Sequence, residues 1–465
     1  MDATTQVLAS TVLSGLDLWE PEHNATLFRP YGDQGASWFI TQQLLGNETP
    51  VSQEEYYAWE EGRIHESFKV RTGIGAPGAG NDAVFVVAVA NVDASNKFYP
   101  QVGDDVKFAN RVSGYIRSIS VSSPSAPELT VAPHNIATDI GALQTNDDVI
   151  IYSNSWGEGS VQPQSRISKP TKRTGHLKII KTTLSATGTE MTNSIRVKVM
   201  DGGGNFLGWY DKTRQIDLDF RHNLAISHAL LVDELVTNTS KVVDAQSTAG
   251  NAVAYGTEGL LTAMAARGLT DTVATATLAL TDFYDYNLLL TKQHNSSNVI
   301  ALCGNKIMQQ INKVLFAANA NSNASWLQDT IDSGIVGDEG DVRAKAMAIN
   351  VKSLMLDDNR MWHFKNMNEF NNPETLGLDT FTYRDTMAVI PTGMTPDAKS
   401  RKLIPYSGIR YKKLGSYNRR MEIWSYGAAG EGPKVGPIDV KHDYMRTHIG
   451  AEHVCVNKML LVGPA

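Results

Sequence analysis

Hydrophobic and polar positions change their period several times along this chain. From about residue 83 to residue 160, short apolar runs alternate with turn residues at the spacing of a β-sandwich or barrel. VFVVAV is a candidate buried strand, and VGDDVKF and TNDDVIIY each place two Asp residues ahead of a valine and an apolar run. These Asp residues lack the alternating carboxylates of a calcium loop, so we interpret them as turn residues. The pattern predicts a small β module.

The next segment is both basic and rich in strand-forming residues. Its apolar positions form two runs, one around Ile179 and one around Val197, and a glycine-rich turn follows at residues 202–205. Charges flank both runs, which is unusual for a pair of strands in a core. We therefore expect a long, protruding β-hairpin.

A helical pattern follows the basic segment. HNLAISHALLVDELV places Leu224, Leu231 and Leu235 on one stripe of a helix. His228 lies on the same stripe, and we interpret it as a hydrogen-bonded histidine of the core rather than as a ligand.

Helix and strand patterns alternate in the second half of the chain. Residues 281–293 predict a helix with Thr281 as its N-cap. NVIALC predicts a buried strand, and KIMQQINKVLF predicts a helix with one apolar face. Further strands are predicted at MEIWSY and at EHVCVNKMLLV. A chain that leaves a β region, builds an α/β region and returns to strands suggests one domain inserted within another.

The first 80 residues show little regular periodicity. Large aromatic residues are scattered there among acidic ones: Trp19, Phe28, Tyr31, Trp38, Phe39, Tyr56, Tyr57 and Trp59. So much apolar surface needs a cover, because exposed it would promote aggregation. The segment ends in GIGAPGAGND, a flexible break. We expect an extended arm that docks on another surface.

Composition places the chain among ordinary folded proteins. Of its 465 residues, 42% are hydrophobic and 20% are charged, which argues against bulk disorder. No apolar run has the length of a membrane span, and the first ten residues lack the features of a secretory signal. Cys303 and Cys455 are the only cysteines, too few for a disulfide framework, so we expect folding in a reducing cytoplasm.

Charge is distributed unevenly. The net charge of -7 argues against a dedicated nucleic-acid binder. Residues 1–69 hold eleven acidic and three basic side chains, whereas residues 166–221 hold eleven basic and five acidic ones. Two interpretations remain open: the two segments attract each other, within one subunit or between copies, or they are separate solvated surfaces.

Motifs that carry catalysis are missing from the sequence. It has no phosphate-binding loop, no His-Glu-x-x-His pair and no Gly-x-Ser-x-Gly elbow. Residues 302–306 stand at a predicted strand-to-helix junction, where an anion could bind amide groups, although one glycine is a weak signal. Asp217 and Asp219 are a candidate carboxylate pair, without a marked base or nucleophile.

Three histidines and one cysteine gather near the C-terminus: His442, His448, His453 and Cys455. The last two would share one face of a strand, so a zinc pair is geometrically feasible. A metal site would need two more ligands, and packing or surface roles are the better interpretation. We therefore predict no catalytic, cofactor-binding or metal-binding residues.

Several stretches, taken in order, resemble the Hong Kong 97-type major capsid proteins of tailed bacteriophages, especially those with a β-rich insertion. VGDDV through NDDVIIYSNSWGEGS resembles their β module, and EGLLTAMAARG at 258–268 resembles the entry to their axial domain. VIALCGNKIMQQINKVL resembles the strand–helix step of that domain. FTYRDTMAVIPTGM and AEHVCVNKMLLVG resemble its late strands and the closing peripheral-domain strand. The likeness covers most of residues 80–465 in pattern and order, and some features also resemble crAss-like phage capsid proteins.

The resemblance implies an α+β fold of the Hong Kong 97 type. Its implied parts are an N-terminal arm (1–80), a β-rich insertion with part of the peripheral domain (81–165), an extended hairpin loop (166–217), the spine helix with peripheral domain (218–257), the axial domain (258–412) and the return strands of the peripheral domain (413–465).

It also implies a structural protein that is no enzyme and needs no cofactor. Such chains self-assemble as hexamers and pentamers into the icosahedral head around a double-stranded DNA genome. Portal, scaffolding and decoration proteins are further partners, packaged DNA is contacted non-specifically and no membrane is involved. The implied location is the virion, after assembly in the host cytoplasm. We further expect the basic hairpin to lie against acidic surface of an adjacent subunit, so charge reversal at Lys178 and Lys181 should alter assembly.

Three rival functions stay open. An encapsulin-like nanocompartment shell shares this fold, but such shells are shorter chains. Another virion component would suit the β content but not the α/β middle. A carbohydrate-active enzyme could line a sugar groove with some of the eight Trp residues.

Overall fold

The structure, a computed structural model, divides into two compact units, Trp59–Arg173 and the combination of Met1–Ala58 with Thr174–Ala465. It describes residues 26–27, 38, 48–61, 67–87, 100–120, 127–163, 165, 170–189, 198–200, 206–208, 210–236, 242–243, 253–273, 278–293, 295, 298–321, 353–355, 360–373, 375–378, 380, 383–392, 394–396, 403–429 and 436–464. Among the helices in these ranges, none combines the length and hydrophobicity that crossing a membrane requires.

The unit Trp59–Arg173 is built on one antiparallel six-stranded sheet. Its strand order is β4 (Ser67–Lys69), β9 (Asp148–Asn154), β6 (Asp104–Lys107), β7 (Ser113–Ser120), β8 (Glu128–Pro133) and β5 (Ala83–Val86). A bridge between Val70 and Val87 joins the two edges, so the sheet closes into a small barrel. Inward-pointing residues such as Phe68, Phe85 and Leu129 fill it. A barrel therefore stands where the alternating pattern predicts a β module, although it spans more than residues 81–165.

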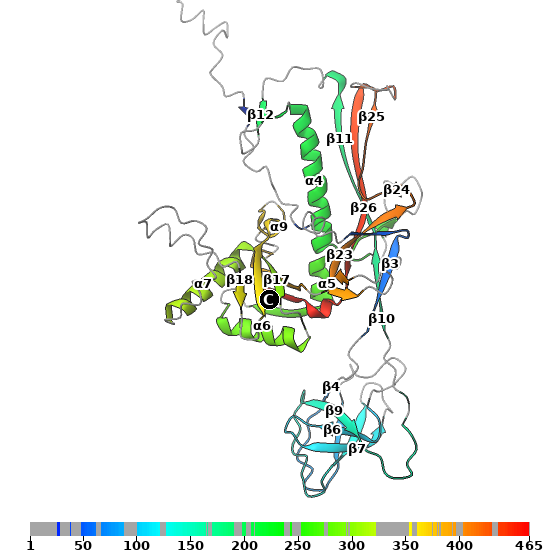
Figure 1. Ribbon diagram of the computed structural model, residues 1–465, viewed down its shortest axis with the longest axis vertical. Helices are drawn as coiled ribbons and strands as arrows, with labels where there is room; N and C mark the ends of the chain where they lie inside the picture. The colour runs from blue at the N-terminus through cyan, green and yellow to red at the C-terminus, as the bar shows by residue number, and fades with distance from the viewer. Residues whose placement is uncertain are drawn as a thin grey trace, which may run out of the picture. The chain divides into compact units, whose positions relative to one another are not determined.

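The second unit contains a long, narrow sheet with a helix along it. β26 (Val440–His453) is 14 residues long and pairs with β11 (Lys178–Thr187) on one side. On its other side it pairs first with β25 (Glu422–Gly427) and then with β23 (Ser407–Leu414). The 23-residue helix α4 (Tyr210–Val232) packs against β11 and β26 (Figure 1).

Among the described residues, the runs around Ile179 and Val197 do not pair with each other; residues 190–197 lie outside the described part, so the protruding hairpin stays a prediction. β11 pairs with β26 over its whole length, whereas β12 (Lys198–Met200) pairs with β13 (Phe206–Gly208) and with β1 (Thr26–Leu27). Alternation along β11 explains why this strand pairs with β26, because it turns Ile180 into a core that a protruding hairpin would not offer. The spine helix begins earlier than the predicted residue 218.

An α/β layer forms the rest of this unit. Its sheet has the order β16 (Leu269–Val273), β27 (Leu460–Pro464), β20 (Met387–Pro391), β17 (Asn298–Cys303), β19 (Met361–Asn366) and β18 (Ser353–Met355). Its helices are α5 (Leu260–Arg267), α6 (Leu280–Lys292), α7 (Asn305–Asn321) and the short α9 (Asn368–Asn371). The remaining short elements are β2 (Glu48–Val51), β3 (Glu55–Glu60), β10 (Thr171–His176), β14 (Val242–Val243), β15 (Val253–Ala254), β21 (Met394–Pro396), β22 (Leu403–Pro405), β24 (Tyr417–Asn418), η3 (Tyr383–Asp385) and η4 (Val456–Lys458). The strand at NVIALC and the helix after it are confirmed.

Thr281 is not the N-cap that the sequence predicts. α6 begins one residue earlier, and Ala279 precedes it. The backbone amide of Ala279 donates to the carboxylate of Asp282 at 2.8 Å. This bond from the N-cap amide to the carboxylate at the third helical position is one half of a capping box, and the methyl side chain of Ala279 cannot provide the other half.

The C-terminal run EHVCVNKMLLV is not one strand. β26 ends at His453, and Cys455 adopts a left-handed conformation with φ of 54° before the turn η4. This break lets β27 join the α/β sheet between β16 and β20. Part of the predicted return segment 413–465 therefore lies with strands of the predicted axial domain.

The predicted arm of residues 1–80 needs the largest correction. β2 pairs with β23, β3 pairs with β10, and β4 belongs to the barrel, so these segments are part of the chain's own fold. Trp38 is buried in the core beside α4 and α5. Trp38 thus finds cover within the same chain, whereas Tyr57 and Trp59 remain more than half exposed. The parts of the arm at residues 1–25, 28–37 and 39–47 lie outside the described residues.

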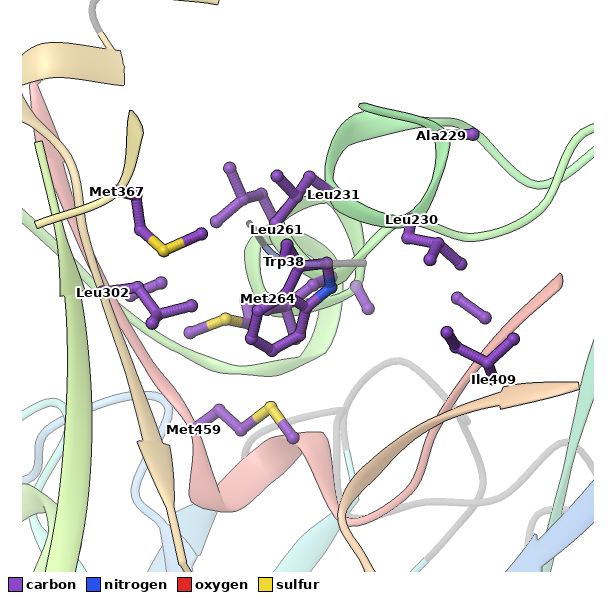
Figure 2. Close-up of a cluster of buried hydrophobic side chains, with 14 of the residues drawn as sticks. Trp38, Ala229, Leu230, Leu231, Leu261, Met264, Leu302, Met367, Ile409 and Met459 are labelled. Atoms are coloured by element: carbon purple, nitrogen blue, oxygen red, sulfur yellow. The ribbon is translucent and has the colours of Figure 1, made fainter. Parts of the chain in front are cut away.

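One buried cluster joins the long sheet, the helices and the α/β sheet. In Figure 2 the Trp38 ring lies next to Met264, with Leu302 of β17 on one side and Ile409 of β23 beyond the other. Leu230 of α4 belongs to the same cluster. The cluster therefore draws its side chains from α4 and from both sheets of this unit.

Candidate assembly surface

A buried histidine fixes α4 to the long sheet. His222 is fully buried, its Nδ1 lies 2.8 Å from Thr182 Oγ1 of β11, and its Nε2 lies 2.6 Å from Thr447 Oγ1 of β26. Burial lowers the pKa of His222, so the ring is neutral at neutral pH, with one nitrogen donating and the other accepting. The two threonines identify the sheet face that meets the helix.

Three of the acidic N-terminal residues that the structure describes are paired inside the chain. Ion pairs join Glu48 to Arg420 at 2.6 Å, Glu54 to Lys412 at 3.9 Å and Glu60 to Arg173 at 3.1 Å. Among these pairs, only that of Glu60 and Arg173 joins the acidic segment, residues 1–69, to the basic segment, residues 166–221. For these residues, attraction operates within one subunit.

Lys178 and Lys181 have different surroundings. Lys178 donates to Asp233 at 2.7 Å, just beyond the end of α4. Lys181 is exposed and, by strand alternation, lies on the sheet face opposite Thr182. The predicted charge contact with a neighbouring subunit therefore rests on Lys181 alone and stays a prediction.

Aromatic and basic side chains gather on the sheet face turned away from α4. Trp424 stacks on Tyr444 with ring centroids 5.3 Å apart, and the ring of His442 lies 5.8 Å from Tyr444. The guanidinium of Arg446 lies 5.1 Å from the Trp424 ring and also contacts Glu422 at 2.6 Å. These contacts hold the aromatic rings in one orientation.

The ionised state of Glu422 is stabilised on this face. Burial alone would raise its pKa, but hydrogen bonds from Tyr417 and Arg446 and the charges of Arg446 and Arg419 lower the pKa below its usual value. The carboxylate therefore remains an acceptor for both arginines well into acid solution.

Large apolar side chains remain exposed along β25 and the segments beside it. They include Ile423, 65% exposed, Trp424, 41% exposed, and Tyr426, 50% exposed. Others on the long sheet or next to it are Ile179, Leu414, Tyr417, Met421 and Ile438. These side chains lie on both faces of one narrow sheet and beside it, and exposed apolar groups gathered in this way are typical of surfaces that contact another molecule. The run MEIWSY predicts only a strand, but its lack of alternation is the signal that both faces carry large side chains.

The C-terminal histidines do not form a metal site. His448 lies in β26 and is 1% exposed; burial and then the charges of Arg419, Lys412 and Arg446 lower its pKa to about 4. Burial and then Arg267 lower the pKa of His453 to about 3. Cys455 has left the strand, so it cannot share a face with His453. Within the described ranges, no three His, Cys, Asp or Glu side chains are grouped to hold a metal.

Two of the amide groups at the strand-to-helix junction of residues 302–306 already donate within the chain. The Gly304 amide donates to the carbonyl of Thr386 at 3.0 Å. The Asn305 amide donates to Oδ1 of Asn371 at 2.7 Å. The helix start is thus capped by the chain itself.

The other candidates from the sequence also take structural positions. Asp217 and Asp219 lie two residues apart on α4, so they point in different directions and do not form a carboxylate pair. His228 is half-buried, and burial lowers its pKa while Glu369 opposes this. Nε2 of His228 has no hydrogen-bond partner among the described residues. At this atom the predicted hydrogen bond is therefore missing.

Comparison with known proteins finds likeness only among solved structures. No family model and no curated protein matches the chain. A structure described as the capsid of a native GTA particle computed with C5 symmetry has 9% sequence identity, covers 99% of this chain and 100% of its own, and gives a TM-score of 0.39. A Microbacterium phage Oxtober96 structure has 8% identity over 97% of this chain and 98% of its own, with a TM-score of 0.40.

A Gordonia phage Cozz structure has 10% identity, covers 100% of this chain and 97% of its own, and gives a TM-score of 0.40. All three structures are thus of phages or of a GTA capsid. With TM-scores this low, the likeness carries no argument about function by itself. A relation to crAss-like phages stays a prediction.

Proposed function

We propose that this chain is the major capsid protein of a tailed phage, with a fold of the Hong Kong 97 type. The observation that carries the proposal is the projecting sheet β11–β26–β25, which leaves Ile423 and Trp424 exposed on opposite faces. Paired strands with apolar residues on both faces are costly in a monomer, and burial between copies would stabilise them by about 25 cal/mol per Å².

The arrangement of elements supports the same proposal. A long helix runs beside a long sheet, an α/β layer follows in the chain, and a separate small barrel is inserted ahead of both. In the proposed assignment α4 is the spine helix, the long sheet belongs to the peripheral domain and its extensions, and the α/β layer is the axial domain. The barrel is the β-rich insertion.

The proposed assembly is a shell of identical chains, arranged as hexamers and pentamers, around double-stranded DNA. Many modest contacts suit such a shell, since each repeats in every copy. The chain acts without catalytic residues and contacts DNA non-specifically. Portal, scaffolding and decoration proteins are its further partners, and it is located in the virion after assembly in the host cytoplasm.

Expression of the unmodified chain tests the proposal. We expect light scattering and negative-stain microscopy to reveal closed shells or their capsomers. The double variant Ile423→Asp, Trp424→Asp should remain folded but assemble far less, whereas Ile136→Asp, at an 80% exposed position of the barrel, should assemble normally. The proposal would be refuted if both variants assembled normally, or if the unmodified chain stayed a monomer under every assembly condition tried.

A further inference from the structure

The sheet face turned away from α4 forms a continuous surface of known register. Lys181 pairs with Arg446, which pairs with Glu422 on its other side. In the same way Tyr444 pairs with Trp424. Residues opposite each other in a ladder share a face, and Thr182 and Thr447, which bind His222, belong to the other one. We name the surface of Lys181, Trp424, Tyr426, His442, Tyr444 and Arg446 the outer face.

The outer face carries ordered aromatic rings, with basic groups at one end. Stacking on Tyr444 and the guanidinium of Arg446 fix the Trp424 ring, and yet 41% of this residue is exposed. Tyr426 is 50% exposed. Exposed rings that are already ordered lose little conformational entropy on binding, which is typical of interface anchors.

Positive charge exceeds negative charge at this end of the sheet. Lys181 is exposed, and Arg446 and Arg419 share one carboxylate, that of Glu422. The nearby Lys412 reaches Glu54 only at 3.9 Å. A surface that combines aromatic rings with surplus cations favours an acidic segment that also carries apolar side chains.

The chain itself contains more than one segment of that composition, among them residues 16–22 and residues 54–61. Residues 16–22 read LDLWEPE, with three carboxylates at Asp17, Glu20 and Glu22 around Trp19. No Lys or Arg occurs among residues 1–28. The acidic residues further along, from Glu48 to Glu60, include three that already have partners within the chain. Residues 16–22 lie outside the described part of the structure.

We propose that residues 16–22 of a second copy bind the outer face, with Trp19 against Trp424 and Tyr426 and the carboxylates beside Lys181 and Arg446. This inference rests on the proposed function, because it needs copies held side by side. Aromatic packing provides the affinity, and the charges select the acidic segment and its direction.

A second copy is favoured over the same copy by the path of the chain. Thr26 and Leu27 pair with β12, which contacts α4. Figure 1 shows α4 between β12 and the strands β11, β26 and β25, and the outer face is turned away from that helix. The seven residues from Thr26 to Trp19 reach at most about 25 Å. Passing a helix and a sheet, each about 10 Å thick, takes about 20 Å of that reach before the segment can turn onto the outer face.

Binding of a peptide to the full-length chain tests the surface. A fluorescein-labelled peptide of residues 13–25 should bind, and fluorescence anisotropy should give about tenfold weaker binding for Trp424→Ala and for Lys181→Glu. Lys107→Glu, an exposed lysine of the barrel, is the matched control and should bind as the unmodified chain does. A peptide with Asp17→Asn, Glu20→Gln and Glu22→Gln should bind more weakly. Equal affinity in all of these pairs would overturn the inference.

A photo-crosslinker at position 20 tests which copy supplies the segment. In particles assembled from mixed ¹⁴N and ¹⁵N chains, we expect crosslinks of hybrid mass to residues 424–426 or 444. Crosslinks of one isotope only would overturn the inference in favour of the same copy. An oligo-dT probe that displaces the peptide and is equally sensitive to Trp424→Ala would overturn it in favour of single-stranded nucleic acid. Shells that form without these crosslinks would refute the inference and leave the proposed function standing.

Discussion

Acid should destabilise this protein through two buried histidines of β26. His448 and His453 have pKa values of about 4 and about 3, below the ordinary value of 6.5. The unfolded chain therefore binds protons at a higher pH than the folded chain does. The stability that these groups contribute is complete above pH 6.5 and is lost as the pH falls toward their folded pKa values.

The size of this destabilisation follows from how far the pH lies below 6.5, the ordinary pKa of histidine. Each pH unit below 6.5 costs about 1.4 kcal/mol per histidine until the folded group itself takes up its proton. At pH 5 each histidine has lost about 2 kcal/mol, so the pair should lower the free energy of unfolding by about 4 kcal/mol. His222 and His228 add to the loss in the same direction, because burial lowers the pKa of both.

Urea unfolding at pH 8 and pH 5, followed by tryptophan fluorescence, measures this loss. The double variant His448→Gln, His453→Gln should lose about 4 kcal/mol less between the two pH values than the unmodified chain. His363→Gln, at an exposed position of β19, is the control and should behave as the unmodified chain does. If the double variant declines as steeply as the unmodified chain, buried histidines are not the cause and the reasoning fails.

Three further changes test the packing around the long sheet and within the α/β layer. Thr447→Val leaves Nε2 of His222 unpaired and should cost about 1–3 kcal/mol in urea unfolding, whereas Thr183→Val on the outer side should change stability by less than about 0.5 kcal/mol. Gly450→Ala places a methyl group 2.7 Å from neighbouring oxygen atoms, so the melting temperature should fall, with a cost of about 1–3 kcal/mol. Trp362→Ala empties the fully buried centre of the α/β layer and should cost about 3–5 kcal/mol in urea unfolding; a loss below about 1 kcal/mol would contradict the described core.

Hydrophobic periodicity predicted those strands and helices whose pattern is complete within a short stretch of sequence. Alternation around Val106 and Leu129 indicated the barrel, and the apolar run ending at Cys303 indicated a buried strand followed by a helix. These patterns are visible because the side-chain period of a strand or a helix is imposed by its own geometry.

Pairings between distant segments could not be predicted in the same way. Lys178 pairs in register with Ile449, and nothing near either residue specifies the partner. The burial of Trp38 likewise depends on α4 and α5, which follow it by many residues. The positive φ of Cys455 was equally hidden, because the residue lies inside an otherwise strand-like run. For the same reason the outer face could not be foreseen: Trp424 and Tyr444 meet only when β25 pairs with β26.

A cryo-electron-microscopy reconstruction of particles assembled from the unmodified chain tests the central claim most directly. The proposed function predicts a closed shell in which Ile423 and Trp424 are buried between neighbouring copies. A shell in which both side chains face solvent, or a preparation that yields only single chains, would contradict it.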